Sequence, residues 1–510
     1  MRFAPSLLVG CVALAATPAS AQQIVTSKQP QAINVTVYRD PGRSGGGEIN
    51  LQWLNGFALI TETRTIALPR GESQIRFEGV ADGIVAVSAV VTGLPGGVVQ
   101  KNRDAALLSP AALLDGTLGN RVTVRRTNKA TGNVELQQAV IRSGPAGAVV
   151  LETANGVESL RCSGLPETLI YQGVPKGLSA KPTLSVLARS PRAQTARVTL
   201  TYLASGFDWA ANYVATVRPD GKSVDLFAWL TVANSNSVTM PQAQMMAVAG
   251  TLNKERDYRE LVTPQAPPQL NLRCYPMGSG RNGIPRTFER YEAEDYLDDR
   301  YPPPPPPVMA PAPAEIAVTG ARIARQEDLG DLKLYRVPMK VTVAAKQQKQ
   351  VALLQKQAVP FERVYKGEIW IGRPLQNISL VQVLRMKNEA AAGLGLPLPS
   401  GGVALFEQAG GKRLLAAQTM MRDHAVKEEV ELNLGITPLV TYQQKLEDAG
   451  MATVILSNAN AFPVSVELAV GADGAEVNNA SQPLKRKNGR MTWFVTVPAK
   501  DTASLTYKAR

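Results

Sequence analysis

The chain contains a single histidine, His424, and three cysteines among its 510 residues, and aromatic residues make up only 5% of it. One histidine cannot build a metal site of several histidines, and no nucleophile with an orienting acid lies beside it in the sequence. The G-x-S-x-G elbow of hydrolases, the phosphate-binding glycine loop and the C-x-x-C pair of redox enzymes are also missing. We therefore predict no catalytic residue, no cofactor and no metal, and we expect His424 in a turn or at a strand edge.

Long apolar runs are scarce as well. Beyond the N-terminus no window offers about 18 uncharged apolar residues, so no integral membrane span is predicted. The first residues, MRFAPSLLVGCVALAATPASAQQ, combine an early Arg2, an apolar run and a late Pro18 before small residues. This pattern predicts a signal peptide over residues 1–21 and a soluble, exported protein, located in the periplasm of a Gram-negative bacterium. Acylation of Cys11, as in a lipoprotein, is the alternative that we do not favour, because it would leave a short apolar core.

Two cysteines remain after such a cleavage, Cys162 and Cys274. In an oxidising compartment they can form a disulfide, and a bond that closes a loop of this length would stabilise the fold by roughly 4–5 kcal/mol. Each can equally be a small buried apolar residue. Both interpretations stay open on the sequence alone.

Alternating apolar and polar residues fill most of the chain, with Gly, Pro and Asn groups as punctuation every eight to twelve residues. Short strands with regular turns predict an all-β protein built of several sandwich or barrel-like domains with immunoglobulin-like strands. The segment SPAALLDGTLG is the exception, and it predicts one short helix that begins at Pro110. Three strands end in the same way, with asparagine before a turn, and we expect the side chain to cap that turn. These residues are Asn234, Asn388 and Asn458.

The region 253–330 breaks the alternation, because it is rich in proline and charge and poor in apolar residues. Such a composition predicts a disordered insertion, with Pro302–Pro307 as a stiff polyproline rod. Its acidic part, FERYEAEDYLDD, is followed by a basic region in which residues 333–387 carry eleven Lys and Arg against two acids. One hypothesis is that the acidic tyrosine segment docks on the basic face and competes with an anionic ligand; the alternative is that both are merely solvated. The residues concerned are Tyr291, Glu292, Asp295, Tyr296 and Tyr301 in the acidic segment, and Lys340, Lys346, Lys349, Lys356, Arg363 and Lys366 in the basic face.

Several phrases resemble one bacterial envelope family, the mucoidy-inhibitor-like proteins that carry domain of unknown function 4139. KPTLSV followed by VTLTYLASGFDWAANYVATV is similar to a family signature of strands and W-x-A-x-Y, with Trp209, Ala211 and Tyr213 in the matching places. The blocks NEAAAGLGLPLPSGGVALFE and WFVTVPAKDTASLTYK resemble the second half of that domain. GFALITETRTIALPRGESQIRFEGVADGI is similar, more weakly, to the partner domain 4140.

The resemblance covers roughly Phe57 to Tyr507, with two departures. No heptad pattern of the coiled coil that usually follows the partner domain appears between residues 81 and 181, and the turn at residues 234–237 lacks the usual glycine. It implies an exported, β-rich protein without enzymatic activity, and it supplies no catalytic residues.

The expected organisation is a signal peptide (1–21), an N-terminal β domain (30–100), a small β-barrel-like segment with one helix (101–180) and a β-rich part (181–510) interrupted by the insertion. The formal net charge of +13 in an exported protein indicates an anionic envelope polymer or a protein partner rather than nucleic acid, although solubility alone also explains it. We therefore predict a non-enzymatic envelope protein that binds or scaffolds. A carboxylate-pair enzyme on envelope polysaccharide, which needs no local motif, and a subunit of a larger envelope assembly are the alternatives.

Overall fold

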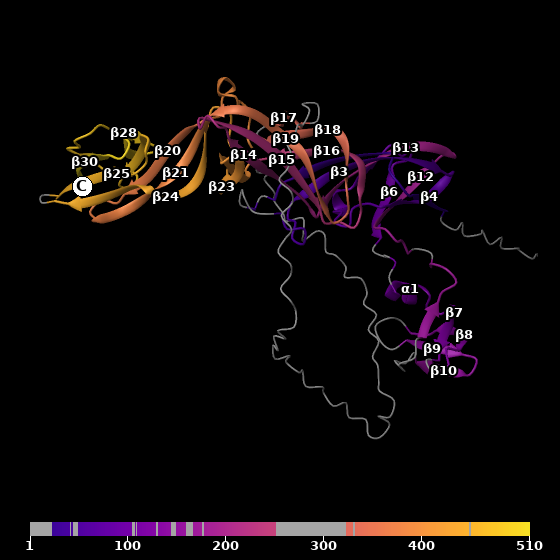
Figure 1. Cartoon of the computed structure of the whole chain (residues 1–510). Coiled ribbons are helices and arrows are strands. Elements are labelled where there is room, and N and C mark those ends of the chain that lie inside the picture. The colour runs from indigo at the N-terminus through magenta and orange to yellow at the C-terminus, as the bar shows by residue number, and fades with distance from the viewer. Residues whose placement is uncertain are drawn as a thin grey trace, which may run out of the picture.

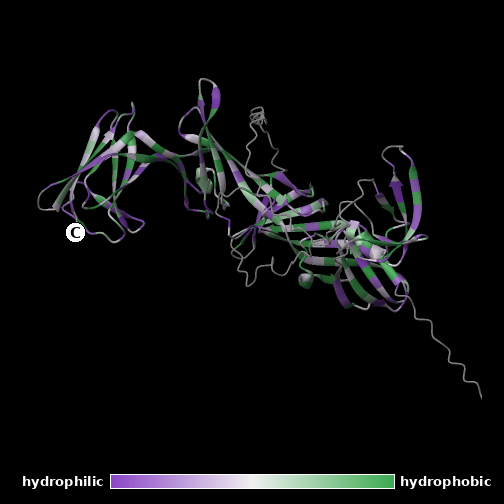
Figure 2. Cartoon of the chain, turned by 90° about the horizontal axis from the view of Figure 1, so that it is seen from below, coloured by the Kyte–Doolittle hydropathy of each residue, from purple (hydrophilic) through white to green (hydrophobic). Residues whose placement is uncertain are grey.

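The computed structural model describes residues 23–509 apart from 41, 44–48, 105–107, 109, 129–130, 144–148, 160–166, 176–177, 251–322, 330–331 and 448–449. The predicted all-β class is confirmed, since strands make up most of this part of the chain (Figure 1). Hydrophobic and hydrophilic residues alternate along the strands (Figure 2), because successive side chains of a strand point to opposite faces. The helical segments of the described chain are α1 (Pro110–Gly116) and two single turns, Ala86–Ser88 and Ala390–Ala392.

The N-terminal sandwich consists of two sheets that share one core. The seven-stranded sheet contains, in sheet order, β17 (Arg325–Leu329), β18 (Leu332–Val343), β16 (Met240–Ala249), β2 (Ala32–Tyr38), β3 (Phe57–Leu68), β13 (Gln194–Ser205) and β5 (Val90–Thr92). The five-stranded sheet contains β19 (Gln347–Pro360), β15 (Ser223–Asn234), β14 (Phe207–Val217), β22 (Gly401–Ala409) and β23 (Lys412–Met421). Their facing apolar side chains form the largest core of the described chain, with Trp209 and Tyr213 of β14 among them.

A four-stranded sheet packs into the same core through Ile75, Phe77, Leu184 and Val186. It contains β1 (Gln23–Ser27), β4 (Gly71–Glu78), β12 (Thr183–Ser190) and β6 (Val98–Asp104).

A small unit with its own core is inserted between β6 and β12. Its five-stranded sheet contains β10 (Gly156–Ser159), β9 (Val150–Thr153), β8 (Val134–Ile141), β7 (Arg121–Thr127) and β11 (Glu167–Ile170). Leu114 of α1 packs against Val122, Val124 and Ile141 of this sheet. Figure 1 shows the unit set apart from the N-terminal sandwich, as separate cores require.

The C-terminal sandwich is formed by one sheet of nine strands that folds over a second large core. In sheet order its strands are β27 (Val477–Asn478), β30 (Thr502–Ala509), β25 (Met451–Asn458), β24 (Glu429–Leu446), β21 (Leu375–Lys387), β20 (Glu362–Ile369), β26 (Val464–Val470), β29 (Arg490–Val497) and β28 (Leu484–Lys487). β24 pairs with β21 from Glu429 to Gln444, and its last residues, Val440 to Leu446, also pair with β25 on the other side.

The strands of the two sandwiches follow one another in the same order if β13 and β14 are counted as one strand and β5, β22, β23 and β27 are left aside, and we therefore call the sandwiches two copies of one arrangement. In the N-terminal sandwich the order is β19-β15-β14 and, through the β13–β14 turn, β13-β3-β2-β16-β18-β17. In the C-terminal sandwich it is β30-β25-β24-β21-β20-β26-β29-β28, with β24 in the place of β13 and β14. The parallel pairs also correspond, since β2 runs parallel to β16 and β20 runs parallel to β26.

Buried asparagines close equivalent turns in the two copies. The Asn234 amide donates to the carbonyls of Val238 and Ala344, and its Oδ1 accepts from the backbone N–H of Asn236 at 3.0 Å. Asn458 repeats this arrangement with Phe462, Pro498 and Asn460, at 2.9, 2.8 and 2.9 Å. The expected capping by the asparagine side chain is thus confirmed in both copies.

A second pair of equivalent bonds lies in the turns that follow β18 and β29. The backbone N–H groups of Lys346 and Lys500 donate to the carbonyls of Asn236 and Asn460, at 3.2 and 3.0 Å. Both lysines have a left-handed backbone, with φ of 52° and 53°, and both close a V-T-V-x-A-K sequence. The duplication is therefore visible in short sequence matches once the structure aligns them.

The fold does not divide at the expected domain boundaries. Strands of residues 30–100 share sheets with strands of residues 183–343, because β3 pairs with β13 and β2 with β16. Residues 98–104 belong to the N-terminal sandwich rather than to the small unit. Pairing between strands distant in the sequence leaves no mark in composition, and therefore sequence order alone misplaced these boundaries.

Most of the predicted disordered insertion, 253–330, lies outside the described residues. Its end differs from the prediction, since Arg325–Leu329 forms β17 and pairs with β18. The strands on either side, β16 and β18, are direct antiparallel neighbours. The chain therefore leaves and re-enters one sheet here.

We predict that Asn458→Ala lowers the free energy of unfolding of the C-terminal sandwich by about 3 kcal/mol, because buried carbonyls lose their donor. Urea unfolding measures this loss. Asn478→Ala in β27 is the matched control, since the exposed Asn478 makes no side-chain hydrogen bond within the described chain, and it should change stability by less than about 0.5 kcal/mol. Equal losses in the two variants would contradict the role of the capping bonds.

Candidate functional site

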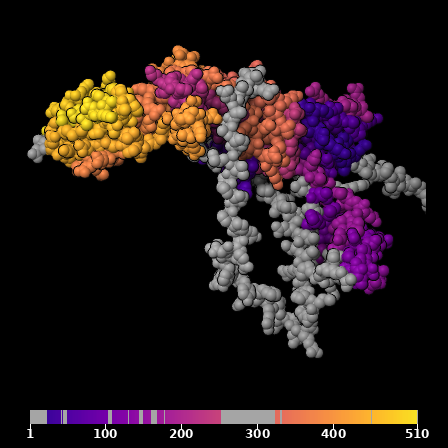
Figure 3. Space-filling view, viewed as in Figure 1, coloured from indigo at the N-terminus to yellow at the C-terminus, as the bar shows by residue number. Residues whose placement is uncertain are grey.

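The C-terminal sandwich contributes a hairpin to the sheet of the N-terminal one. β22 runs parallel to β14 over six residue pairs, from Ala211 opposite Gly401 to Thr216 opposite Phe406. A Cβ atom at Gly401 would lie 2.0 Å from the carbonyl oxygen of Ala211, so only glycine permits this approach. The space-filling view shows orange residues of this region directly beside magenta residues of the N-terminal sandwich (Figure 3).

We call the contact between the sandwiches the joint, and define it as segments 388–400 and 422–428 with the residues of the N-terminal sandwich that bind them. Two tyrosine hydroxyls donate to its backbone carbonyls, Tyr213 to Pro399 at 2.7 Å and Tyr335 to Pro397 at 3.2 Å. Leu384 and Met386 of β21 complete the joint by entering the N-terminal core.

An ion pair adds to the joint. Arg39, after β2, bonds the Asp423 carboxylate at 2.8 Å and also the hydroxyl of Ser400. The backbone N–H of Ser400 donates to the same carboxylate at 2.8 Å. Burial raises the pKa of Asp423, but the bonds from Arg39 and Ser400 outweigh it and lower the pKa below its usual value. Asp423 is therefore a fixed anion that holds the two sandwiches together.

The residues of the W-x-A-x-Y signature have structural roles. Trp209 donates its indole N–H to the carbonyl of Val248 at 2.9 Å, Ala211 faces Gly401, and Tyr213 binds the joint. All three are buried in the N-terminal core. None of them is exposed to a ligand in this structure.

Asp208 is the carboxyl group of the described chain whose pKa is shifted in the direction expected of a catalytic acid. Burial raises its pKa above the usual value although Arg43 lies 3.1 Å away. Its carboxylate also accepts from the backbone N–H groups of Asp40 and Trp209, at 3.0 and 2.7 Å. Since only 2% of Asp208 is exposed, we interpret it as the anchor of the connection before β3 rather than as a catalytic acid.

A second buried charge pair lies in the N-terminal core. Arg64 bonds Glu62 at 2.8 Å and the carbonyls of Ser27 and Glu78, and the Tyr202 hydroxyl donates to Glu62 at 2.8 Å. Every charge in this network has partners, and the network fastens β1 and β4 to β3. It is too deeply buried for a substrate to reach.

The C-terminal sandwich carries a line of alternating charges across its strands, which we call the charge ladder: Lys366, Arg385, Glu431, Glu467 and Lys487. The Nη2 atom of Arg385 donates to both Glu431 and Glu467, at 2.7 and 2.8 Å. Lys366 bonds Glu431 at 2.7 Å, and Lys487 bonds Glu467 at 3.1 Å. Each carboxylate thus has two cationic partners.

Glu431 and Glu467 are a close pair of carboxylates, because both bind the same nitrogen atom. Such an enzyme needs one carboxyl with a raised pKa to donate a proton. Here burial raises the pKa of each carboxyl, but the bonds from Arg385 and the lysines outweigh it, and both pKa values are lowered. Neither residue holds a proton at neutral pH, so this pair does not fit the role of a general acid.

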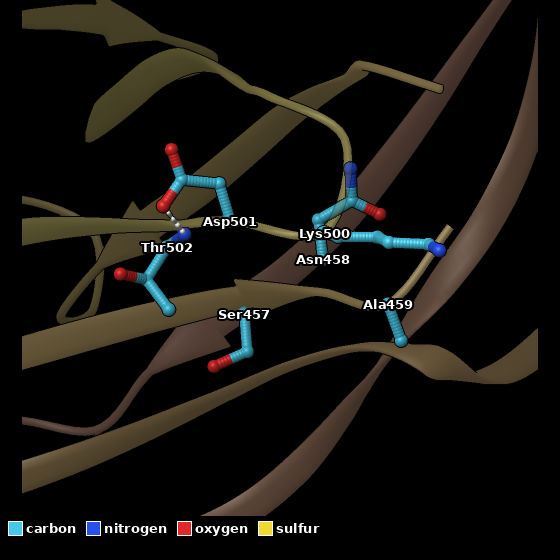
Figure 4. Close-up of a pocket in the computed structure, with 6 residues that line it drawn as sticks. All are labelled: Ser457, Asn458, Ala459, Lys500, Asp501 and Thr502. Atoms are coloured by element: carbon cyan, nitrogen blue, oxygen red, sulfur yellow. Dashed lines mark hydrogen bonds between the residues drawn. The ribbon is translucent and has the colours of Figure 1, made fainter. Parts of the chain in front are cut away.

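A shallow pocket of about 400 Å³ lies at the end of the C-terminal sandwich, between the turns that follow β25 and β29 (Figure 4). It is lined by Ser457, Asn458, Ala459, Lys500, Asp501 and Thr502. The Asp501 carboxylate accepts from the Thr502 backbone N–H at 2.8 Å, and the Lys500 side chain points away from it. The pocket thus offers hydroxyls, one cation and one anion to solvent.

The equivalent place in the N-terminal sandwich is partly covered. Gln348, which corresponds to Thr502, donates to the carbonyl of Ile49 at 3.1 Å, within the long connection of residues 39–56. The corresponding connection in the C-terminal sandwich, residues 370–374, is short and is bound by Gln444 instead. The two sandwiches thus differ at this place, since Gln348 is bonded to Ile49 in one and a pocket lies beside Thr502 in the other.

The residues of the predicted basic face lie on β18, on β19, on β20 and in the turn between β18 and β19. Arg363 and Lys366 lie on β20 in ion pairs with Glu407 and Glu431, at 2.9 and 2.7 Å. Lys356 lies on β19, away from the remaining three. Of the remaining three, Lys346 stands in the β18–β19 turn and Lys340 and Lys349 stand on the two strands that the turn connects. All three are exposed, and we call them the turn lysines. No acidic side chain of the described chain pairs with them.

The other predicted residues lie outside the described chain. These are Cys162, Cys274, Tyr291, Glu292, Asp295, Tyr296 and Tyr301, so the disulfide and the docking of the acidic segment stay predictions.

His424 lies in the joint and forms a short bridge with Leu398, as expected for a turn or strand-edge histidine. Within the part of the chain that the structure describes, no three His, Cys, Asp or Glu side chains gather as metal ligands do. No helix in that part combines the length and the hydrophobicity of a membrane span.

Comparison with known proteins gave no match, either among protein-family models or among curated proteins. The resemblance to the mucoidy-inhibitor-like family accordingly stays a prediction.

The charge ladder and the joint were not found from the sequence. Arg385, Glu431 and Glu467 stand on three strands far apart in the chain, and each looks like an ordinary surface residue of an alternating strand. The turns, in contrast, can be recognised in the sequence, because asparagine recurs at the strand ends and Lys346 and Lys500 close matching sequences.

We predict that Arg385→Met destabilises the C-terminal sandwich by about 3 kcal/mol at pH 7, because the buried Glu467 and the partly buried Glu431 lose their shared partner. Since both glutamate pKa values are lowered in the fold, their contribution exists above the unfolded pKa of about 4.3 and is lost as pH falls through the folded values. Urea unfolding at pH 7 and pH 3.5 should therefore show a smaller difference between variant and wild type at pH 3.5. Lys485→Ala, at an exposed lysine of β28, is the control, and a pH-independent loss in Arg385→Met would contradict the ion-pair interpretation.

Proposed function

We propose that this protein is an exported, non-enzymatic component of the bacterial cell envelope that binds an anionic envelope polymer and holds it on a rigid β scaffold. The observation that carries the proposal is the group of turn lysines at the end of the N-terminal sandwich.

Lys346 supports a binding role through its backbone. A left-handed conformation is costly for a residue with a long side chain, and glycine or asparagine would fit the turn better. The C-terminal copy has lysine at the equivalent position, Lys500, with the same conformation. Both sandwiches thus present a lysine at the equivalent turn.

Rigidity supports the scaffolding part of the proposal. The joint combines parallel strand pairing, a shared apolar core, two tyrosine hydrogen bonds and the Arg39–Asp423 ion pair. A ligand that contacts both sandwiches would therefore meet lysines at a fixed separation, and binding would cost little ordering entropy.

One observation favours the assembly alternative. β23 is at the edge of its sheet and exposes Leu414, Leu415 and Met420, at 53%, 52% and 54%. Exposed apolar side chains on an edge strand are typical of surfaces that pair with another chain. The protein would then bind its polymer as one subunit of an envelope assembly.

A charge-reversal experiment tests the polymer proposal. The triple variant Lys340→Glu, Lys346→Glu and Lys349→Glu should lose at least tenfold in affinity for alginate, an anionic polysaccharide, at low ionic strength, because attraction becomes repulsion. Binding is measured by surface plasmon resonance on immobilised alginate, with neutral dextran as the reference surface.

The control carries the same change in net charge elsewhere: Lys412→Glu, Lys445→Glu and Lys485→Glu, at exposed positions on β23, β24 and β28. Equal weakening of both triple variants would mean that total charge and not the turn lysines governs binding. Equal binding of wild type to dextran and alginate would contradict an anionic ligand.

A further inference from the structure

The five-stranded sheet of the N-terminal sandwich presents aromatic side chains on the side away from the core. Leu226 and Leu230 of β15 are buried in the core, whereas Phe227 and Trp229 point to the opposite side and are partly exposed. Their rings lie 4.7 Å apart, edge to face. This side of the sheet is therefore open to solvent at its aromatic residues.

The strand register places amide and small side chains beside these rings. Asn212 of β14 lies opposite Trp229 on one side and Gly402 on the other, and Gln418 of β23 lies opposite Ala404. Asn212 and Gln418 are exposed. We call this set the outer face: Phe227, Trp229, Asn212, Val214, Gly402, Ala404, Phe406 and Gln418.

Several polar groups of the outer face have no partner within the described chain. The Oδ1 atom of Asn212 accepts from the Thr231 hydroxyl at 2.7 Å, but its amide nitrogen donates to none of the described residues. The side-chain amide of Gln418 and the indole N–H of Trp229 are unbonded there as well. Free donors beside apolar rings fit a ligand that offers both hydroxyl groups and C–H surfaces, as a sugar ring does.

Arg413 adds a positive charge at one end of the outer face. Its guanidinium lies 5.3 Å from the centre of the Phe406 ring, and no acidic side chain of the described chain pairs with it. Asp225, the acid of β15 that precedes Phe227, is already held by the Ala358 backbone N–H at 2.8 Å. The charge of the outer face is therefore complementary to an anion.

Two of the turn lysines stand at the opposite corner of the same sheet. Lys349 pairs with Val232 near the end of β15, and Lys346 directly precedes β19. Arg413 pairs with Gln408 near the end of β22, on the far edge strand. With neighbouring strands about 4.8 Å apart, the two edge strands are separated by roughly 19 Å, and the outer face lies between them.

We propose that the outer face binds one chain of a polysaccharide whose sugar units carry carboxylates. The sugar rings pack on Trp229 and Phe406, their hydroxyl groups bond the amides of Asn212 and Gln418, and their carboxylates meet Arg413 and the turn lysines. This inference rests on the proposed function and adds to it the class of sugar and the surface that holds the rings.

The experiment measures binding of the full chain to immobilised alginate at low and at high ionic strength. Trp229→Ala keeps every charge, and it should lower the affinity at least fivefold under both conditions, because ring packing is not screened by salt. The loss in the turn-lysine triple variant should instead shrink as the salt concentration rises. Trp229→Phe, which keeps a ring, should bind within twofold of wild type.

Trp370→Ala is the matched control for Trp229→Ala. Trp370 is 58% exposed and also has an arginine over its ring, Arg373 at 5.9 Å, but it belongs to the C-terminal sandwich. Its loss should leave the affinity for alginate unchanged.

A second variant keeps the test decisive if Trp229→Ala does not fold. A Cβ atom at Gly402 would meet nothing within 4 Å, so the fold accepts a side chain there. Gly402→Glu places a carboxylate in the middle of the outer face, and it should weaken alginate binding at least tenfold at low ionic strength. Lys485→Gln, which changes the net charge equally, is its control and should bind nearly as wild type does.

Three results would overturn the inference. Wild-type binding by both Trp229→Ala and Gly402→Glu, with a loss only in the turn-lysine variant, would remove the outer face and leave the proposed function intact. Absence of alginate binding by the wild type would remove both. A dimer seen by analytical ultracentrifugation without alginate, and abolished by Gly402→Glu, would assign the outer face to a second copy of the chain.

Discussion

The parallel pairing of β22 with β14 is the interaction on which the arrangement of this protein depends. Through it a hairpin from the C-terminal sandwich completes a sheet of the N-terminal one, and six residue pairs replace what would otherwise be a flexible linker. The close approach at Gly401 requires a residue without a side chain, and the apolar side chains of β21 and β24 then enter a core that belongs to the other sandwich. The two sandwiches thereby share a sheet and a core.

The two sandwiches illustrate how one fold can diverge without changing its strand order. The strand order, the parallel pairs and the asparagine-capped turns are common to both, and these are the features that buried hydrogen bonds enforce. Loops differ freely because they lie in solvent. The connection 370–374 is short where the other copy has residues 39–56, and Gln348 is bonded to Ile49 where the C-terminal sandwich has the pocket beside Lys500.

The sequence was sufficient for the all-β class, the short helix at Pro110 and the capping role of the strand-end asparagines, because each depends on local periodicity or on a side chain that reaches its own turn. It was insufficient for the domain boundaries and for the charge ladder. Arg385 gains its meaning only from Glu431 and Glu467 on neighbouring strands, and strand neighbours are set by pairing between distant segments. The residues of the predicted basic face are divided for a related reason. Residues close in sequence, such as Lys356 and Arg363, are carried by strands of different sheets.

The continuity of β24 has a consequence for how the C-terminal sandwich is attached. In the N-terminal sandwich the backbone turns at Gly206, with φ of 79°, between β13 and β14, but in the C-terminal sandwich one strand of 18 residues stands in their place. At about 3.3 Å per residue such a strand is up to ~60 Å long. It begins directly after the joint and pairs with β21 over most of its length and with β25 at its end, so a single strand links the joint to the interior of the C-terminal sandwich.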